Sequence, residues 1–244
     1  MKRDRTAPAK VGLSTWPTPL EPAPRLATAL GLRPGDLWIK RDDLTGLGGG
    51  GNKVRKLEYT CAAALANEAQ TLVTTGAAQS NHARLTAAGA RLGLDVVLVL
   101  AGKPPATLTG NLALDGLFGA RIEWAGDVDD HELDAIAREH AFQLSTRGTR
   151  TELIPFGGSS VLAAHGYVDC GKELRGQAPD LAHVVVAVGS GATMAGLVHA
   201  LGSEHVYGVH TGAVADPEAR VLGFVDGLRG GEPPVPGAFG LTRW

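Results

Sequence analysis

Strand-like apolar runs alternate with helix-like stretches along almost the whole chain, and this alternation limits the possible folds more than any other feature. The run Asp95-Val-Val-Leu-Val-Leu is continuously apolar, as is typical of a strand buried on both faces. Similar runs occur at 37–40, 71–75, 121–124, 153–156, 183–188 and 206–209. Because helical patterns separate most of these runs, the sequence predicts an α/β fold with mainly parallel sheets and right-handed crossovers.

Charge and cysteine content exclude several classes of partner. The 244 residues carry a net charge of −2 with a pI near 6.4, so no broad basic surface is available for nucleic acid or for a membrane. No apolar run is long enough to span a membrane, and no apolar leader follows the charged N-terminus. Cys61 and Cys170 belong to no CxxC or Cys/His cluster, which argues against a metal site or disulfides. We therefore expect a cytoplasmic protein that binds a small molecule.

Four consecutive glycines, residues 48–51, stand directly before a predicted helix that begins near Asn52. Such a run permits positive φ angles and a close approach of the backbone to a ligand. Lys53 and Lys56 are three residues apart, so a helix places both on one face. A flexible linker before a solvated basic helix is the alternative. Cations are disfavoured at a helix N-terminus, so the pattern indicates an anionic ligand or nearby carboxylates.

Two further junctions between strand and helix carry polar groups, at the sheet edge where α/β proteins bind ligands. The loop that starts at Gly76 contains Gln79, Ser80, Asn81 and His82. Ser80 is either a helix N-cap or a residue that faces the same ligand as Lys53.

The second of these junctions, Gly189-Ser-Gly-Ala-Thr193, opens a helix, so its backbone N–H groups form either an anion site or only a tight turn.

Other phosphate-binding patterns fit poorly. Residues 46–51 match G-x-G-x-x-G, but the strand that follows does not end in the acidic residue that a dinucleotide site requires. The P-loop pattern fails because Asn52, not lysine, follows the last glycine. A reactive lysine on one loop and a phosphate cradle on another remain, and they are the minimum that a pyridoxal phosphate enzyme needs.

Four segments together resemble the pyridoxal phosphate enzymes of the D-cysteine desulfhydrase and 1-aminocyclopropane-1-carboxylate (ACC) deaminase family. They are Lys40-Arg-Asp-Asp-Leu-Thr-Gly, Gly50-Gly-Asn-Lys-Val-Arg-Lys-Leu-Glu-Tyr, Gln79-Ser-Asn-His-Ala-Arg and Gly189-Ser-Gly-Ala-Thr-Met-Ala-Gly-Leu. The resemblance covers nearly the whole chain. It implies a tryptophan synthase β-like fold (fold type II) with two α/β domains: a large cofactor-binding domain, residues 1–58 and 157–244, and a small α/β domain, residues 59–156.

The resemblance also implies roles for individual residues. Lys53 would carry the Schiff base with pyridoxal 5'-phosphate and act as the catalytic base, Ser80 would be a second catalytic residue, and Asn81 would contact the 3'-oxygen of the pyridine. The remaining cofactor contacts would come from Asn52, Lys56, Gly189, Ser190, Gly191, Ala192 and Thr193. The substrate contacts would come from Gln79, Ser80, Asn81 and His82.

The implied substrate is a small amino acid, and the desulfhydrase branch is favoured by Leu44-Thr45-Gly46 and by the run 80–84. That reaction eliminates a β-leaving group and yields pyruvate, ammonia and sulfide. ACC deaminase and L-cysteate sulfo-lyase are the alternative activities. Relatives are commonly homodimers, which makes a homodimer a further expectation.

Relatives continue beyond the position of Trp244 with an active-site tyrosine, a residue that faces the pyridine nitrogen and a Thr-Gly-Gly loop. The chain is therefore expected to lack the C-terminal segment of the family, after a helix at 216–228 and a Gly/Pro-rich tail at 227–240. A cofactor-binding remnant with little activity is the corresponding non-enzymatic alternative.

Overall fold

The computed structural model describes residues 8–230 and 241–243. Strands and helices alternate along it, as the sequence predicts, and the α/β fold class is confirmed. The strands are β1 Leu20–Pro22, β2 Trp38–Lys40, β3 Thr71–Ala77, β4 Asp95–Ala101, β5 Arg121–Gly126, β6 Thr151–Ile154, β7 Val184–Val188, β8 Val206–His210 and β9 Leu241–Arg243. The α-helices are α1 Pro24–Ala29, α2 Lys53–Ala66, α3 Asn81–Ala88, α4 Gly110–Leu117, α5 Asp130–Thr146, α6 Val161–Gln177, α7 Ala192–Leu201 and α8 Pro217–Arg229.

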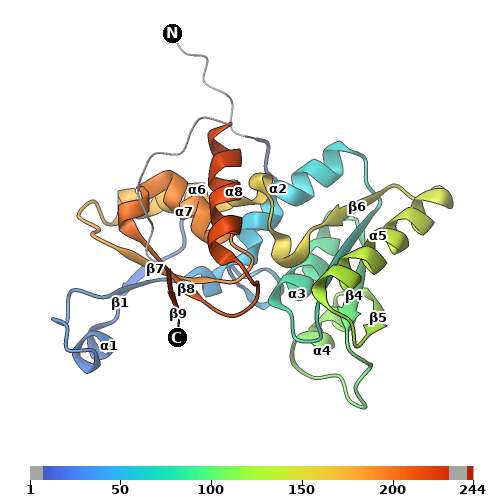
Figure 1. The fold of residues 1–244 in the computed structure, drawn as a ribbon, viewed down its shortest axis with the longest axis horizontal. Helices are drawn as coiled ribbons and strands as arrows, with labels where there is room; N and C mark the ends of the chain where they lie inside the picture. Colours follow the sequence, from blue (N-terminus) through green and yellow to red (C-terminus); the bar gives the residue numbers. More distant parts are fainter. Residues whose placement is uncertain (1–7, 231–240, 244) are drawn as a thin grey trace, which may run out of the picture.

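A four-stranded parallel sheet with the order β5-β4-β3-β6 occupies one half of the molecule (Figure 1). Its two central strands, β3 and β4, are buried along nearly their whole length, as their continuous apolar runs predict. Alternate side chains of these strands pack into two separate hydrophobic cores, one on each face of the sheet. Leu72, Val96 and Leu98 pack with α2, α3 and α4 on one face, whereas Val73 and Val97 pack with α5 on the other.

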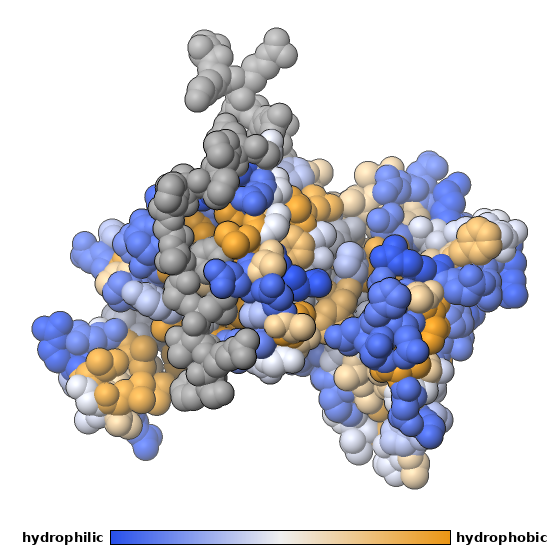
Figure 2. Space-filling view, in the orientation of Figure 1, coloured by the Kyte–Doolittle hydropathy of each residue, from blue (hydrophilic) through white to orange (hydrophobic). Residues whose placement is uncertain are grey.

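The other half of the molecule contains the three-stranded parallel sheet β7-β8-β9, whose core is shared with α6, α7 and α8 (Figure 1). Val188, Met194 and Val206 are buried in that core. The opposite face of the sheet is open, because Val185 is 71% and its paired neighbour Tyr207 is 41% exposed. Further apolar surface is exposed around α1 and β2, at lower left in Figure 2.

Helix α2 lies between the two halves, which fixes its first turn at their junction (Figure 1). Val54 and Leu57 pack in the core beneath the four-stranded sheet, and Gly166 of α6 lies so close that a Cβ there would come within 2.2 Å of the Arg55 carbonyl oxygen. The predicted domain boundaries, residues 1–58 and 157–244 against 59–156, stay a prediction. None of the helices within residues 8–230 combines the length and the hydropathy that crossing a membrane would take.

Candidate functional site

The glycine run before α2 has the backbone geometry that the sequence predicts. Gly48, Gly49, Gly50 and Gly51 all have positive φ, from 57° to 142°. A Cβ on Gly50 would lie 2.0 Å from the carbonyl oxygen of Asp43, so no other residue fits there. The run packs against protein, however, because Arg84 donates hydrogen bonds to the carbonyl oxygens of Gly48 and Gly50. The expected close approach of the glycines to a ligand therefore stays a prediction, while their role in setting the start of α2 is evident.

Lys53 and Lys56 share one face of the first two turns of α2, and burial acts on both amines. Lys56 is 1% exposed, and burial, followed by the charge of Lys53 and that of Arg220, holds its pKa well below the ordinary value. Burial also lowers the pKa of Lys53, partly offset by its interaction with Lys56. Neither amine forms an ion pair with a carboxylate among residues 8–230. A helix N-terminus and burial both disfavour positive charge on these two amines. Balancing that charge is therefore left to a ligand.

The positive charge of Arg55, which lies between the two lysines, is balanced by carboxylates of the protein itself. Its guanidinium is 2% exposed and donates to both carboxylate oxygens of Asp42 and both of Glu173, at 2.8–2.9 Å. The carboxylates that the sequence predicts near this helix start are thus present, and they pair with Arg55 and, in the case of Glu173, with Lys40, but not with Lys53 or Lys56. An anionic ligand is the remaining explanation for Lys53 and Lys56.

The Lys56 amine is held by a pair of serines. Its Nζ donates to Ser159 Oγ at 3.0 Å, and Ser159 Oγ is 2.6 Å from Ser190 Oγ. Ser159 follows the 3-10 turn η4 (Phe156–Gly158), where Gly157 has φ +62° and a Cβ would lie 2.4 Å from Ser190 Oγ. Lysine, hydroxyls and a glycine bend thus converge next to the loop before α7.

That loop leads into α7 through Gly191, which has φ +96° and serves as its N-cap without a side-chain hydrogen bond. The first N–H groups of α7 therefore remain available to a ligand, and the helix N-terminus favours an anion. A cavity of about 220 Å³ opens here. It is lined by Asn52, Lys53, Asn81, Ala187, Val188, Gly189, Ser190, Gly191, Thr193, Met194 and Thr211.

The loop before α3 contributes Asn81 to this cavity. Asn81 Oδ1 accepts hydrogen bonds from Arg84 at 3.2 Å and from Asn111 at 3.1 Å, which leaves its amide NH₂ as the donor for a ligand. Ser80 Oγ caps α3 by accepting from the backbone N–H of Ala83 at 3.1 Å. The N-cap alternative for Ser80 is therefore observed, and the catalytic role of Ser80 stays a prediction.

Three of the predicted substrate contacts, Gln79, Ser80 and His82, lie outside the lining of the cavity. Gln79 is tied to α4 through the backbone N–H of Asn111, at 2.8 Å. His82 is buried, and its Nε2 is 2.8 Å from Thr74 Oγ1. Because Thr74 gives its proton to the Ile154 carbonyl oxygen, His82 is the donor and carries its proton on Nε2. Burial, then the charges of Lys53 and Lys56, lower the pKa of His82, so the ring is neutral.

Some residues at the site escaped the sequence reasoning. Ser159 approaches Lys56 from a loop that follows the predicted strand 153–156, and the Gly157-Gly158-Ser159 pattern after that strand was the available signal. Thr211 lines the cavity from the end of β8, where its hydroxyl donates to the Val188 carbonyl oxygen at 3.1 Å. It had no signal of its own, because a threonine after a strand is common.

The residues present fit pyridoxal phosphate. A phosphate needs several donors and positive charge, which Lys56, Ser190 and the first turn of α7 supply within one region. An aldehyde needs a nearby amine that is not fully protonated, and burial gives Lys53 that property. Asn81 offers a donor for an oxygen on the ring.

Replacing Gly191 with valine is expected to weaken cofactor binding by about tenfold or more, with a small change in thermal midpoint. The reason is that φ +96° strains a β-branched residue by about 1–2 kcal/mol and moves the N–H groups that would face the phosphate. Equilibrium titration of the cofactor-free chain measures the affinity. Gly212, also at positive φ (+80°) but absent from the cavity lining, is the matched control for valine substitution. Full cofactor affinity in Gly191→Val would reduce the loop to a turn.

Comparison with known proteins agrees with this geometry. The family model described as pyridoxal-phosphate dependent enzyme matches residues 11–242. A putative ACC deaminase of Pyrococcus furiosus is 39% identical over 226 residues, which are 91% of this chain and 64% of the relative. A D-cysteine desulfhydrase of Salmonella schwarzengrund is 42% identical over 230 residues, covering 88% of this chain and 68% of the relative.

A crystal structure of an ACC deaminase homologue superposes with a TM-score of 0.86 at 36% identity, and covers 97% of this chain and 74% of that one. The chain spans 57–64% of the length of the three Pyrococcus relatives that it matches. The family match extends over both halves of the fold and over all three loops that meet at the cavity. The chain belongs to the family of pyridoxal-phosphate dependent enzymes.

Proposed function

We propose that this chain is a pyridoxal-phosphate-dependent lyase or deaminase of a small amino acid, and that its substrate is D-cysteine. The observation that carries the proposal is the meeting of Lys53, Asn81 and the Ser190–Thr193 loop at one cavity. The family membership and the relatives named ACC deaminase and D-cysteine desulfhydrase support the reaction class. A homodimer and a cytoplasmic location stay predictions.

In this proposal each side of the cavity has a separate task. Lys56, Ser190 and the N–H groups at the start of α7 would hold the phosphate, and the Asn81 amide would orient the ring through its oxygen. When bound, the cofactor supplies an electron sink for the negative charge that develops at the substrate Cα. Lys53, in the lining of the cavity, would bind the aldehyde carbon of the cofactor, and its amine would be the base that takes the Cα proton.

The environment of Lys53 suits a base. Because burial lowers the pKa of Lys53, a larger fraction of its amine is unprotonated near neutral pH than for an exposed lysine. His82, neutral and proton-bearing at Nε2, adds no positive charge beside it. The rate is expected to rise with pH as Lys53 loses its proton, with a midpoint below the ordinary lysine value.

The overall reaction balances without an oxidant. Lys53 takes the Cα proton, the Cβ–S bond breaks, and the sulfur leaves with the electron pair and a proton as hydrogen sulfide. The remaining aminoacrylate reacts with one water molecule to give pyruvate and ammonia. The same lysine could start opening of the cyclopropane ring of ACC, which is the second candidate because the Pyrococcus relatives and the homologue of known structure carry that name.

D-cysteine is expected to be converted to pyruvate with a kcat/KM at least about tenfold higher than that for conversion of ACC or L-cysteate. A tenfold preference means that the site binds the transition state of the preferred substrate more tightly than those of the competing substrates, by about 1.4 kcal/mol or more. Release of the 2-oxo acid from each of the three compounds, at matched cofactor occupancy, measures the difference: pyruvate from D-cysteine and L-cysteate, and 2-oxobutyrate from the four-carbon ACC. Preference for ACC would replace the desulfhydrase proposal with the deaminase, and cofactor uptake without a 2-oxo acid product from any of them would contradict the lyase proposal.

A further inference from the structure

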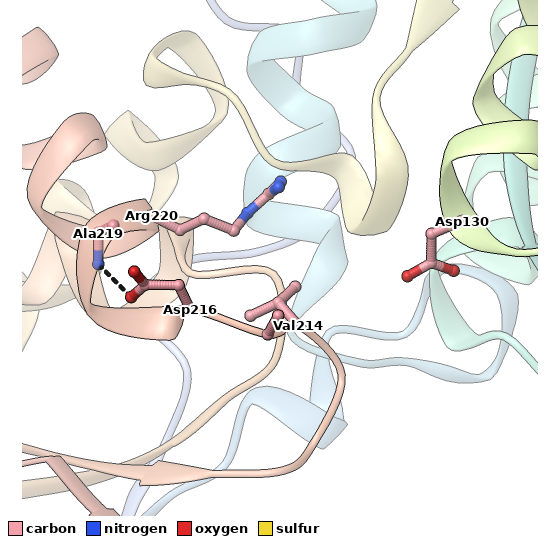
Figure 3. Close-up of a pocket in the computed structure, with 6 residues that line it drawn as sticks. Asp130, Val214, Asp216, Ala219 and Arg220 are labelled. Carbon is pink, nitrogen blue, oxygen red and sulfur yellow. Dashed lines mark hydrogen bonds between the residues drawn. The ribbon is translucent and has the colours of Figure 1, made fainter.

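Arg220 lies in the first turns of α8, beside the loop that precedes α7. Its Nε donates to the carbonyl oxygen of Ser190 at 3.4 Å, and its Cβ is 3.5 Å from the point that a Cβ on Gly191 would occupy. Figure 3 shows its side chain extended away from Asp216, across the space in front of α2, with the guanidinium toward that helix and the η4 turn. The guanidinium is thus directed toward the two elements next to Lys56 and Ser159, while its Nε bonds to the Ser190 carbonyl oxygen.

Arg220 is thus a third basic side chain beside Lys53 and Lys56. The charges of Lys53 and Arg220 both act, after burial, to lower the pKa of Lys56, which places Arg220 within effective electrostatic range of that amine. No carboxylate in residues 8–230 pairs with Arg220, Lys53 or Lys56. Like charges brought this close destabilise one another unless an anion lies between them.

The acidic residues nearest to Arg220 do not supply that anion. Asp216 shares with Arg220 a surface cavity of about 480 Å³, but its carboxylate caps α8 by accepting from the Ala219 N–H at 2.9 Å. Asp130 lines the same cavity from the start of α5, on the far side in Figure 3. Because neither carboxylate forms an ion pair with the guanidinium, its four remaining N–H groups are available to a ligand.

We propose that Arg220 is a phosphate-binding residue that holds pyridoxal phosphate from the α8 side, opposite Lys56. The planar guanidinium donates to one or two phosphate oxygens while its Nε stays on the Ser190 carbonyl. Lys56 is buried and held by Ser159, so the position of its amine is fixed, whereas the exposed Arg220 would approach the phosphate from the solvent side. The proposal rests on the cofactor of the proposed function and not on its substrate.

The test compares pyridoxal phosphate with pyridoxal, which has the same ring and aldehyde but no phosphate. Dissociation constants for both are measured by absorbance titration of the full chain after removal of any cofactor. Arg220→Gln is expected to weaken binding of pyridoxal phosphate by about tenfold, or about 1.4 kcal/mol. Binding of pyridoxal should change by less than about twofold, and Arg220→Lys should recover part of the loss because it keeps the charge.

Arg229→Gln is the matched control, because it removes the same charge from the last turn of the same helix. It should leave both dissociation constants unchanged. Arg220 is itself exposed, so its replacement is expected to leave the thermal midpoint within about 2 °C of the original. If Arg220→Gln fails to fold, Arg220→Lys replaces it in the test. The ratio of its affinities for pyridoxal phosphate and pyridoxal is then expected to be lower than in the unaltered chain.

Two outcomes would overturn the proposal separately from the proposed function. Unchanged affinity for pyridoxal phosphate in Arg220→Gln would show that the guanidinium does not contact the phosphate. Equal losses for pyridoxal phosphate and pyridoxal would show that Arg220 only supports the fold of the loop. An unaltered chain that binds neither compound would instead overturn the cofactor assignment itself, and with it the whole proposed function.

Discussion

Replacing Lys53 with alanine is expected to lower pyruvate formation by at least about a thousandfold, which is the largest effect of any single substitution in this chain. Lys53 is the one lysine in the cavity lining, and burial lowers its pKa, so attachment of the cofactor and removal of the Cα proton both depend on it. The assay is pyruvate release from D-cysteine at saturating cofactor. Lys56→Ala should act differently, mainly by weakening binding of the cofactor.

Borohydride reduction separates the two lysines directly. Reduction of the cofactor-loaded chain, followed by peptide mapping, should find the cofactor fixed covalently on Lys53, because Lys56 is committed to Ser159 and lies one helical turn further on. Label on Lys56 would reverse the two roles. A Lys53→Ala chain that keeps more than about a tenth of the original rate would show that another group acts as the base.

Replacing Arg55 with alanine is expected to destabilise the fold by about 3 kcal/mol and to lower the thermal midpoint by about 6–12 °C. Burial by itself lowers the pKa of Arg55, but the hydrogen bonds that it donates to Glu173 and Asp42 outweigh that effect and raise the pKa. Removing the guanidinium leaves two partly buried carboxylates without their main partner, although Lys40 still pairs with Glu173 at 2.8 Å. It also removes the cation that stacks 4.1 Å from the Trp16 ring.

Arg138→Ala is the control for this prediction. Arg138 pairs with Asp134 one turn earlier in α5, at 2.8 Å, but 68% of its side chain is exposed. An exposed pair of this kind contributes about 0.5 kcal/mol or less, so the thermal midpoint should hardly move. Scanning calorimetry of both variants gives the comparison. Similar midpoints for Arg55→Ala and the unaltered chain would mean that the buried network contributes no net stability.

The strands and helices could be predicted closely because their signals are local. The periods of apolar residues placed β3, β4 and α2 within a few positions of their observed bounds. The glycine run was also predictable, since four glycines in succession indicate positive φ whatever surrounds them. The place of Lys53, Asn81 and the 189–193 loop at one cavity was predictable as well, because they follow the C-terminal ends of strands or open helices, and their functional roles stay predictions.

What surrounds those residues could not be predicted, because it depends on contacts between distant parts of the chain. Arg55 and Glu173 are 118 positions apart, so the sequence left open whether carboxylates or a ligand balance each cation at the start of α2. The fold pairs Arg55 with Asp42 and Glu173, whereas no carboxylate in the part of the chain that the structure describes pairs with Lys53 or Lys56.

The sequence by itself determined the fold class and the three loops of the cavity, because hydrophobic period and loop chemistry act over a few residues. Only the tertiary structure decided that the glycines pack on Arg84, that Ser159 holds Lys56, and that His82 lies behind the site rather than in it. Each of these outcomes depends on which elements the sheets and helix α2 bring together, and packing over long separations sets that arrangement.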